Sequence, residues 1–245
     1  MGNLRKDHVA ERFVIVNELK TKPSTSKKNP FKPGNEKMTN PSVLSLVLKD
    51  GMLQRLQDED DTDSVKNWAV RVVPAINPAV DIETENTYSD HPLYSEPSYG
   101  YHYNIIASPD ETKSLATIDV EQWGYVLSVV QDRLRWLYTQ KGVAYVAIYG
   151  DSGKASGTKI PHPHLHMISF STIPPKIEEE ANSSHRILNE KGVYPMSQLV
   201  TSEAGGPRQI LQTEGFIALS PWAPSHPYEF WICPKKHATS FSKIS

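Results

Sequence analysis

The sequence predicts a globular α+β protein. One stretch, between Asp119 and Gly142, carries apolar residues at spacings of three and four, the period of an amphipathic helix. Short apolar or β-branched runs typical of strands lie on both sides of it. Apolar residues make up 38% and charged residues 22% of the 245-residue chain, which favours a sizeable core over disorder. This length fits one large domain or two fused units.

The first hundred residues alternate strand-like and loop-like segments. Strands are expected at residues 12–17, 68–73 and 103–107. The proline- and lysine-rich residues 21–37 are expected to form an exposed connection, because three prolines exclude a helix or an interior strand. Residues 57–63 lack the turn glycine of a calcium loop and are expected to form a solvated acidic loop.

The expected helix begins at Asp119, whose side chain can cap it together with Gln122. Its apolar positions are Trp123, Val126, Leu127, Val130, Leu134 and Leu137, and this face is expected to cover a sheet. A strand at residues 143–149, a loop with three glycines and a second apolar run at 167–173 follow. Helix is expected within residues 177–200, and strands at 216–219 and 228–233.

Charge and cysteine content exclude several classes of protein. Lysine and arginine number 26 and aspartate and glutamate 28, so no overall basic field exists to hold a nucleic acid or an anionic membrane. The single cysteine forbids an intramolecular disulfide and suits a reducing compartment. The chain begins with no apolar signal segment and has no run of 18 apolar residues. A soluble, cytoplasmic protein is therefore expected.

The segment that points to chemistry is His162-Pro163-His164-Leu165-His166. In an extended chain alternate side chains share a face, so the three imidazoles should line one side of a strand. Imidazole can act as nucleophile, acid or base near neutral pH, and the preceding glycine loop, with Thr158 and Lys159, could hold a phosphate. Two other interpretations stay open. The histidines could form a metal site of the His-x-His type, or they could be hydrogen-bonded residues of the core without a chemical role.

Three motifs, Asp151-Ser152-Gly153, Ser156-Gly157-Thr158 and His162-Pro163-His164, together resemble the active-site segment of the galactose-1-phosphate uridylyltransferases. This family is the transferase branch of the histidine triad superfamily. Further segments match in the family's order from residue 4 to 241, namely residues 4–7, 29–36, 71–74, 77–79, Gly100 with His102, 108–110, 227–229 and 234–237.

The resemblance implies roles for particular residues. His164 matches the nucleophile that attacks the α-phosphorus of a nucleotide sugar and becomes a nucleotidyl-histidine. Asn77 lies in the segment that lines the nucleotide pocket, and Lys20 and Lys22 match a basic pair near the N-terminus. The expected phosphate-binding residues of the loop are Asp151, Gly153, Gly157, Thr158 and Lys159.

One departure concerns metal. Family members often hold a structural zinc through a Cys-x-x-Cys pair, a histidine after the Ser-Pro-Asp turn and the first histidine of the His-Pro-His motif. Those places here read Asn29, Lys32, Glu111 and His162. Because a lysine ammonium would repel the ion, no zinc is expected there. The expected reaction uses no metal and no other cofactor. His162 is then expected to orient its neighbours.

Another departure is His166, where the transferases have glutamine. A histidine can hydrogen-bond a phosphoryl oxygen and also supply a titrating proton. The histidine triad hydrolases have a histidine at this place, so the resemblance shifts the expectation toward nucleotide hydrolysis. Lys159 replaces a usual serine and adds a cation beside the phosphates.

A further departure is where the chain ends. The resemblance implies a histidine-triad-like antiparallel sheet with packed helices in residues 1–204, followed by a partial second unit of the same kind in residues 205–245. An unpaired sheet edge would favour a homodimer.

The expected function is nucleotidyl transfer from a nucleotide sugar to a sugar phosphate or phosphate. In it His164 is the nucleophile, His166 donates to a phosphoryl or leaving oxygen and His162 orients. The alternatives are a histidine-triad-type nucleotide phosphohydrolase and a catalytically silent nucleotide-binding protein.

Overall fold

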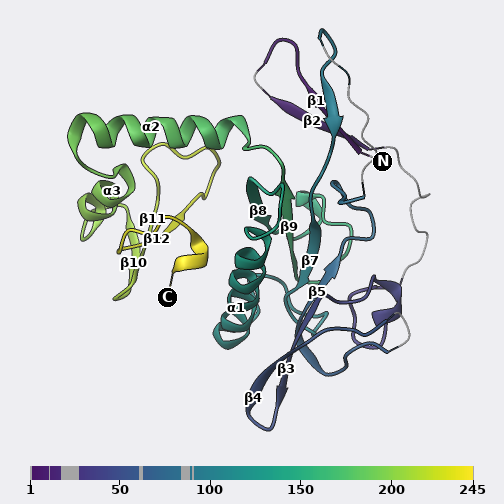
Figure 1. Ribbon diagram of the computed structural model, residues 1–245. Helices are drawn as coiled ribbons and strands as arrows, with labels where there is room; N and C mark the ends of the chain where they lie inside the picture. The colour runs from purple at the N-terminus through teal and green to yellow at the C-terminus, as the bar shows by residue number, and fades with distance from the viewer. Residues whose placement is uncertain are drawn as a thin grey trace. The chain divides into compact units, whose positions relative to one another are not determined.

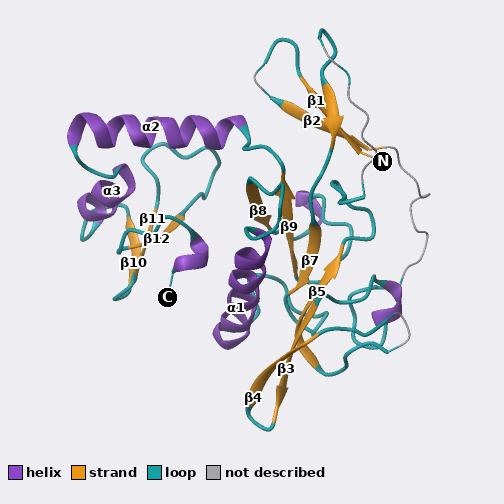
Figure 2. Cartoon of the chain, in the orientation of Figure 1, coloured by secondary structure: helices purple, strands orange, loops and turns teal. Residues whose placement is uncertain are grey.

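The computed structural model describes residues 2–10, 12–17, 28–60, 63–83, 89 and 91–244. The fold is α+β, as expected, with antiparallel sheets and few helices (Figures 1 and 2). The chain forms two compact units, Met1–Pro174 and Pro175–Ser245. This structural division precedes the helices of residues 175–203, and the functional boundary after residue 204 stays a prediction.

A six-stranded antiparallel sheet forms the centre of the first unit, in the order β4-β3-β5-β7-β9-β8. Its strands are β3 (Leu44–Lys49), β4 (Met52–Leu56), β5 (Trp68–Pro74), β7 (His102–Ile106), β8 (Tyr145–Tyr149) and β9 (His164–Phe170). The expected strands at 68–73 and 103–107 are therefore confirmed, but β9 begins three residues before the expected 167.

Helix α1 (Val120–Leu137) packs on one face of this sheet. Its buried side chains include Val126, Val130, Leu134 and Leu137 as expected, and Val129 in place of Leu127. Asp119 caps the helix by accepting a hydrogen bond from the Gln122 main-chain N–H at 2.8 Å. The Gln122 side chain does not return to the cap, because it donates to the main-chain oxygens of Ala69 in β5 and of Ala107, which follows β7.

A second apolar cluster covers the opposite face of the sheet. Phe31 is only 1% exposed there and packs with Val73 and Ile106. The 3-10 helix η1 (Glu36–Met38) follows, and its Glu36 is also buried. The expectation of an exposed connection is thus wrong for Phe31 and Glu36, which anchor the segment to the sheet, whereas five of the other residues in 28–37 are exposed. Residues 21–27 lie outside the described ones.

The acidic loop at residues 57–63, which was expected to be solvated, contains a buried side chain. Asp58 is buried and forms an ion pair with the equally buried Arg71 of β5, with 2.7 Å between Oδ2 and Nη2. Burial raises the pKa of Asp58, but hydrogen bonds from Ser42 N–H, Val65 N–H and Arg71 outweigh it and hold that pKa below its usual range. The loop is therefore tied to the sheet by one carboxylate.

A small antiparallel sheet, β2-β1-β6, completes the first unit. It contains β1 (Gly2–Lys6), β2 (Phe13–Asn17) and β6 (Ser95–Pro97). The expected strand at 12–17 is β2, while β1 and β6 had no clear strand pattern.

The second unit has two helices, α2 (Pro175–Lys191) and α3 (Pro195–Glu203), and a sheet in the order β10-β11-β12. The strands are β10 (Gln209–Gln212), β11 (Phe216–Leu219) and β12 (Trp231–Pro234), and a 3-10 helix η3 (Phe241–Lys243) follows. The strand expected at 228–233 begins only at Trp231. Tyr228 has a φ of 63°, which no strand residue adopts. Within the described part of the chain, no helix is long and apolar enough to cross a bilayer.

Candidate active site

Strand β9 presents different chemistry on its two faces. Leu165 and Met167 point into the apolar core that α1 covers. His164 and His166 lie on the other face, with their ring centroids 5.0 Å apart. The neighbouring strand β7 places Asn104 opposite His166. The alternation of the sequence therefore correctly predicted that these two histidines share a face.

A cavity of about 310 Å³ opens over this face. Seven of the residues singled out in the sequence line it, namely Asn77, Asp151, Gly157, Thr158, Lys159, His164 and His166. The other lining residues are Phe31, Ala75, Ile76, His102, Asn104 and Ile160. Gly153 and His162 are not among the lining residues, and Lys20 and Lys22 lie outside the residues that the structure describes.

The ring of His164 is held in one protonation form. Its Nδ1 lies 2.7 Å from the main-chain oxygen of His162. Because a carbonyl oxygen only accepts, Nδ1 carries the proton, and the neutral ring has its lone pair on Nε2. Burial lowers the pKa of His164, although the hydrogen bond to the carbonyl and the charge of Asp151 oppose this. A neutral imidazole with a free Nε2 lone pair is a nucleophile at neutral pH.

His162 lies outside the cavity and is fixed from both sides. Its Nε2 lies 2.7 Å from the main-chain oxygen of Ser108, so Nε2 is the donor. Its Nδ1 lies 3.0 Å from the amide nitrogen of Asn29, which must then donate to it. His162 precedes β9 and is not among the lining residues, so two of the three imidazoles face the cavity. The role of His162 in catalysis stays a prediction. Its carbonyl group, however, orients His164.

The four residues at the family's zinc positions do come together, but as a polar cluster. Lys32 forms an ion pair with Glu111. The Asn29 amide donates to Glu111 at 3.3 Å and to His162 at 3.0 Å. An ammonium group paired to the carboxylate and an amide nitrogen that faces the imidazole are not zinc ligands. These residues do not fit a zinc ion.

The loop between β8 and β9 depends on glycine where it borders the cavity. It contains the 3-10 helix η2 (Lys154–Ser156), which Gly157 ends with a φ of 85°. L-residues rarely adopt this left-handed conformation, whereas glycine adopts it at little cost. The conformation brings Thr158 and Lys159 to the cavity wall.

Two polar residues of β7 were missed as site residues. His102 Nε2 lies 3.2 Å from His166 Nδ1. Asn104 is buried, and its side-chain oxygen has no hydrogen-bond partner among the described residues. His102 belongs to one of the segments that match the family, but an isolated polar residue on a strand does not by itself indicate a role in a site. Only the register of β7 against β9, sixty residues later, places them beside His166.

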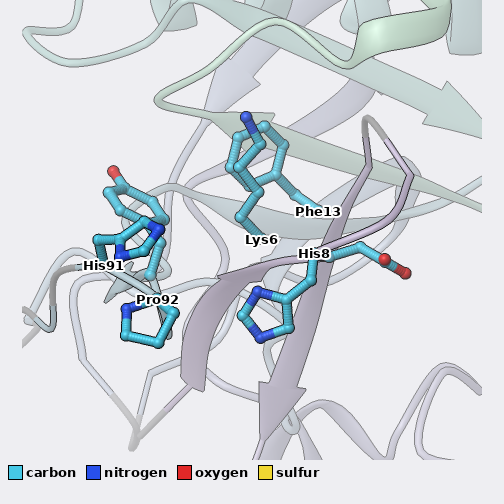
Figure 3. A pocket seen from close by; sticks show the side chains of 7 residues that line it. Lys6, His8, Phe13, His91 and Pro92 are labelled. Atoms are coloured by element: carbon cyan, nitrogen blue, oxygen red, sulfur yellow. The ribbon is translucent and has the colours of Figure 1, made fainter.

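The first unit has a larger cavity, of about 480 Å³, away from the histidine row. The β1–β2 hairpin contributes Lys6, His8 and Phe13, and His91 and Pro92 come from the segment that precedes β6 (Figure 3). Its lining contains neither a residue of the β9 row nor one of the glycine loop. The smaller cavity is therefore the candidate active site.

The amino-acid sequence of this chain is similar to those of known proteins. Residues 59–174 match the family model described as galactose-1-phosphate uridyl transferase, N-terminal domain. An ADP-glucose phosphorylase of Arabidopsis thaliana is 25% identical over 247 residues, which cover 98% of this chain and 68% of that protein. A galactose-1-phosphate uridylyltransferase of Thermotoga maritima is 30% identical over 154 residues, which cover 63% of this chain and 48% of that enzyme. The match thus spans about half of the latter enzyme.

Solved structures support the fold. A structure described as that of a uridylyltransferase matches 99% of this chain and 69% of its own, with a TM-score of 0.80 and 19% identity. An ADP-glucose phosphorylase of Arabidopsis thaliana with bound ADP-glucose matches 100% of this chain and 72% of its own, with a TM-score of 0.72 and 22% identity.

Proposed function

We propose that this chain is a member of the galactose-1-phosphate uridylyltransferase family, whose N-terminal domain model matches residues 59–174. In this proposal it transfers a nucleoside monophosphate from a nucleotide sugar to a phosphate-bearing acceptor through a covalent bond to His164. The acceptor is inorganic phosphate or a sugar phosphate. Both acceptors are considered because the relatives include uridylyltransferases and an ADP-glucose phosphorylase.

The observation that carries the proposal is the hydrogen bond from His164 Nδ1 to the His162 carbonyl oxygen. It leaves Nε2 unprotonated on a residue that lines the cavity. It also prepares the ring for charge, because bonding Nε2 to phosphorus makes the imidazole cationic and strengthens its Nδ1–H donor. A histidine held in this way needs no separate base to activate it.

The proposed first step is a displacement at the α-phosphorus. Nε2 of His164 forms a bond to phosphorus, and the bond between that phosphorus and the oxygen of the β-phosphate breaks. The sugar phosphate leaves with the electron pair and needs no proton, because a phosphate monoester is mostly dianionic at neutral pH. In the second step an oxygen of the acceptor phosphate attacks phosphorus, and the electron pair of the P–N bond returns to Nε2.

Charge at the phosphoryl group is offset by residues that line the cavity. Lys159 contributes a cation and Thr158 a hydroxyl from the glycine loop. Hydrogen-bond donors already in place before reaction cost no reorganisation when charge develops. His166 contributes a ring N–H beside the nucleophile.

Two other functions remain as outcomes of the test. With water as acceptor the protein would be a nucleotide phosphohydrolase, and without a covalent step it would be a nucleotide-binding protein. The similarity to an ADP-glucose phosphorylase over 98% of the chain favours inorganic phosphate as an acceptor and adenine as a base to test alongside uracil.

The experiment uses ADP-glucose and UDP-glucose that carry ³²P at the α-position. We expect acid-labile label on the purified protein, none on His164→Ala, and undiminished label on His185→Ala, a histidine exposed on α2. Chase with phosphate, with hexose 1-phosphate or with buffer alone identifies the acceptor. Equal rates of monophosphate release in all three chases would show hydrolysis, and label on His164→Ala would refute His164 as the nucleophile.

A further inference from the structure

We propose that His102 is a positioning residue that holds His166 in its neutral, Nε2-protonated form, so that His166 acts only as a hydrogen-bond donor to the phosphoryl group. The inference rests on the proposed function for what His166 binds. The positions of the protons on the Ala79 main-chain nitrogen, His102 and His166 do not depend on that function.

A main-chain N–H sets the direction of the chain of hydrogen bonds. The Ala79 N–H donates to His102 Nδ1 at 3.1 Å. A main-chain nitrogen only donates, so Nδ1 of His102 is unprotonated and its proton lies on Nε2. Burial, with a smaller effect of His166, lowers the pKa of His102 to about 4. His102 therefore has one proton, on Nε2, at neutral pH.

That proton determines the form of His166. His102 Nε2 lies 3.2 Å from His166 Nδ1, so His102 donates and His166 Nδ1 accepts. The proton of a neutral His166 must then lie on Nε2. Burial, and the proximity of His164, also lower the pKa of His166, which favours the neutral ring.

The sheet fixes the ring plane as well as its proton. Tyr149 of β8 is the cross-strand partner of His166, and the two rings stack at 21° with centroids 5.0 Å apart. Asn104 of β7 lies on the other side of His166 in the sheet. Three adjacent strands therefore hold this imidazole, which is how a donor is kept in place before substrate arrives.

The two histidines of the cavity consequently have opposite roles. His164 has its proton on Nδ1 and a lone pair on Nε2, whereas His166 has a lone pair on Nδ1 and its proton on Nε2. His164 can attack phosphorus, and His166 can donate to a phosphoryl oxygen. A ring in the form of His166 cannot remove a proton from water through Nε2, so this arrangement favours a phosphate acceptor over hydrolysis.

The direct test is ¹⁵N NMR of the histidine rings in the substrate-free protein at pH 7, which distinguishes protonated from unprotonated ring nitrogens. We expect His166 to have an unprotonated Nδ1 and a protonated Nε2. In His102→Leu, which cannot donate, we expect the signal of the Nδ1-protonated form of His166 to appear, while His185→Ala leaves His166 unchanged. A His166 that is doubly protonated at pH 7, or protonated on Nδ1, overturns the inference.

A double-mutant cycle tests whether this arrangement matters for turnover. In the native background His102→Leu should lower kcat about two- to tenfold, the worth of one hydrogen bond. A glutamine amide donates without titrating, so His166→Gln should keep at least about a tenth of the activity, and His102→Leu should cost little in that background. His166→Phe, which has no donor, should lose far more.

The cycle separates positioning from a purely structural role. Equal losses from His102→Leu in both backgrounds would mean that His102 only supports the fold and would overturn its role at His166. Loss of all activity in His166→Gln would show that a titrating imidazole is needed and would also overturn it. If no covalent label forms on His164, the proposed function fails, whereas the ring NMR of His102 and His166 still decides this inference.

Discussion

Replacing Asp58 by alanine is expected to destabilise the first unit by about 3–5 kcal/mol, the cost of leaving a buried charge without its partner. The carboxylate accepts hydrogen bonds from Ser42 N–H at 2.7 Å, Val65 N–H at 2.9 Å and Arg71 at 2.7 Å. Its side chain is fully buried and that of Arg71 is 1% exposed, so water cannot replace what is lost. The Nε of Arg71 has no partner among the described residues even before the change.

The assay is urea unfolding followed by circular dichroism and tryptophan fluorescence. With a slope of about 2 kcal/mol per M, the midpoint should fall by roughly 1.5–2.5 M. The matched control is Asp132→Ala on α1, which pairs with Arg55 and Arg135 at partly exposed positions and should cost no more than about 1 kcal/mol.

A second variant identifies the origin of the loss. Combining Asp58→Asn with Arg71→Met removes both charges and keeps one side-chain oxygen that can accept from the Ser42 or the Val65 N–H, so it should recover part of the lost stability. The reasoning is wrong if Asp58→Ala loses no more than Asp132→Ala, or if the double variant is as unstable as the single one.

Three further outcomes are expected. Asn104→Leu removes a buried oxygen without a partner, so KM for the nucleotide should rise about tenfold while Tm stays level or increases; a lower Tm with unchanged KM would contradict this. Hydrogen bonds outweigh the burial of Glu36 and lower its pKa to about 2. The lowered pKa contributes on the order of 3 kcal/mol to the free energy of unfolding above about pH 5, and this contribution should disappear as the pH falls toward 2. The difference in the free energy of unfolding between the native protein and Glu36→Gln should therefore decrease to zero over that range. Gly157→Ala and Gly192→Ala, both at positive φ in open space, should each cost about 1 kcal/mol, but only the former should slow turnover; equal turnover of the two variants would argue against the loop's role.

Local patterns predicted the elements whose signals are local. The spacing of Val126, Val130 and Leu134 predicted α1, and the alternation of His164, Leu165 and His166 predicted the two faces of β9. Both follow from the geometry of a single element, so neighbouring residues are sufficient to find them.

What the sequence did not predict depends on contacts between distant segments. Phe31 and Asp58 lie in segments whose composition is typical of exposed loops, and each is buried by a partner on the sheet. His102 and Asn104 acquire a role only from the register between β7 and β9. One anchoring residue or one strand register changes the environment of a side chain without changing the composition around it.

The cluster of Asn29, Lys32, Glu111 and His162 also affects how readily substitutions could convert it into a zinc site. A tetrahedral thiolate and imidazole site here would require Asn29→Cys, Lys32→Cys and Glu111→His together. Any single exchange removes a hydrogen-bond or charge partner from the residues that remain, before it supplies enough ligands for an ion. Installing a zinc site here is therefore expected to need several exchanges together, because each one alone leaves a polar partner unsatisfied.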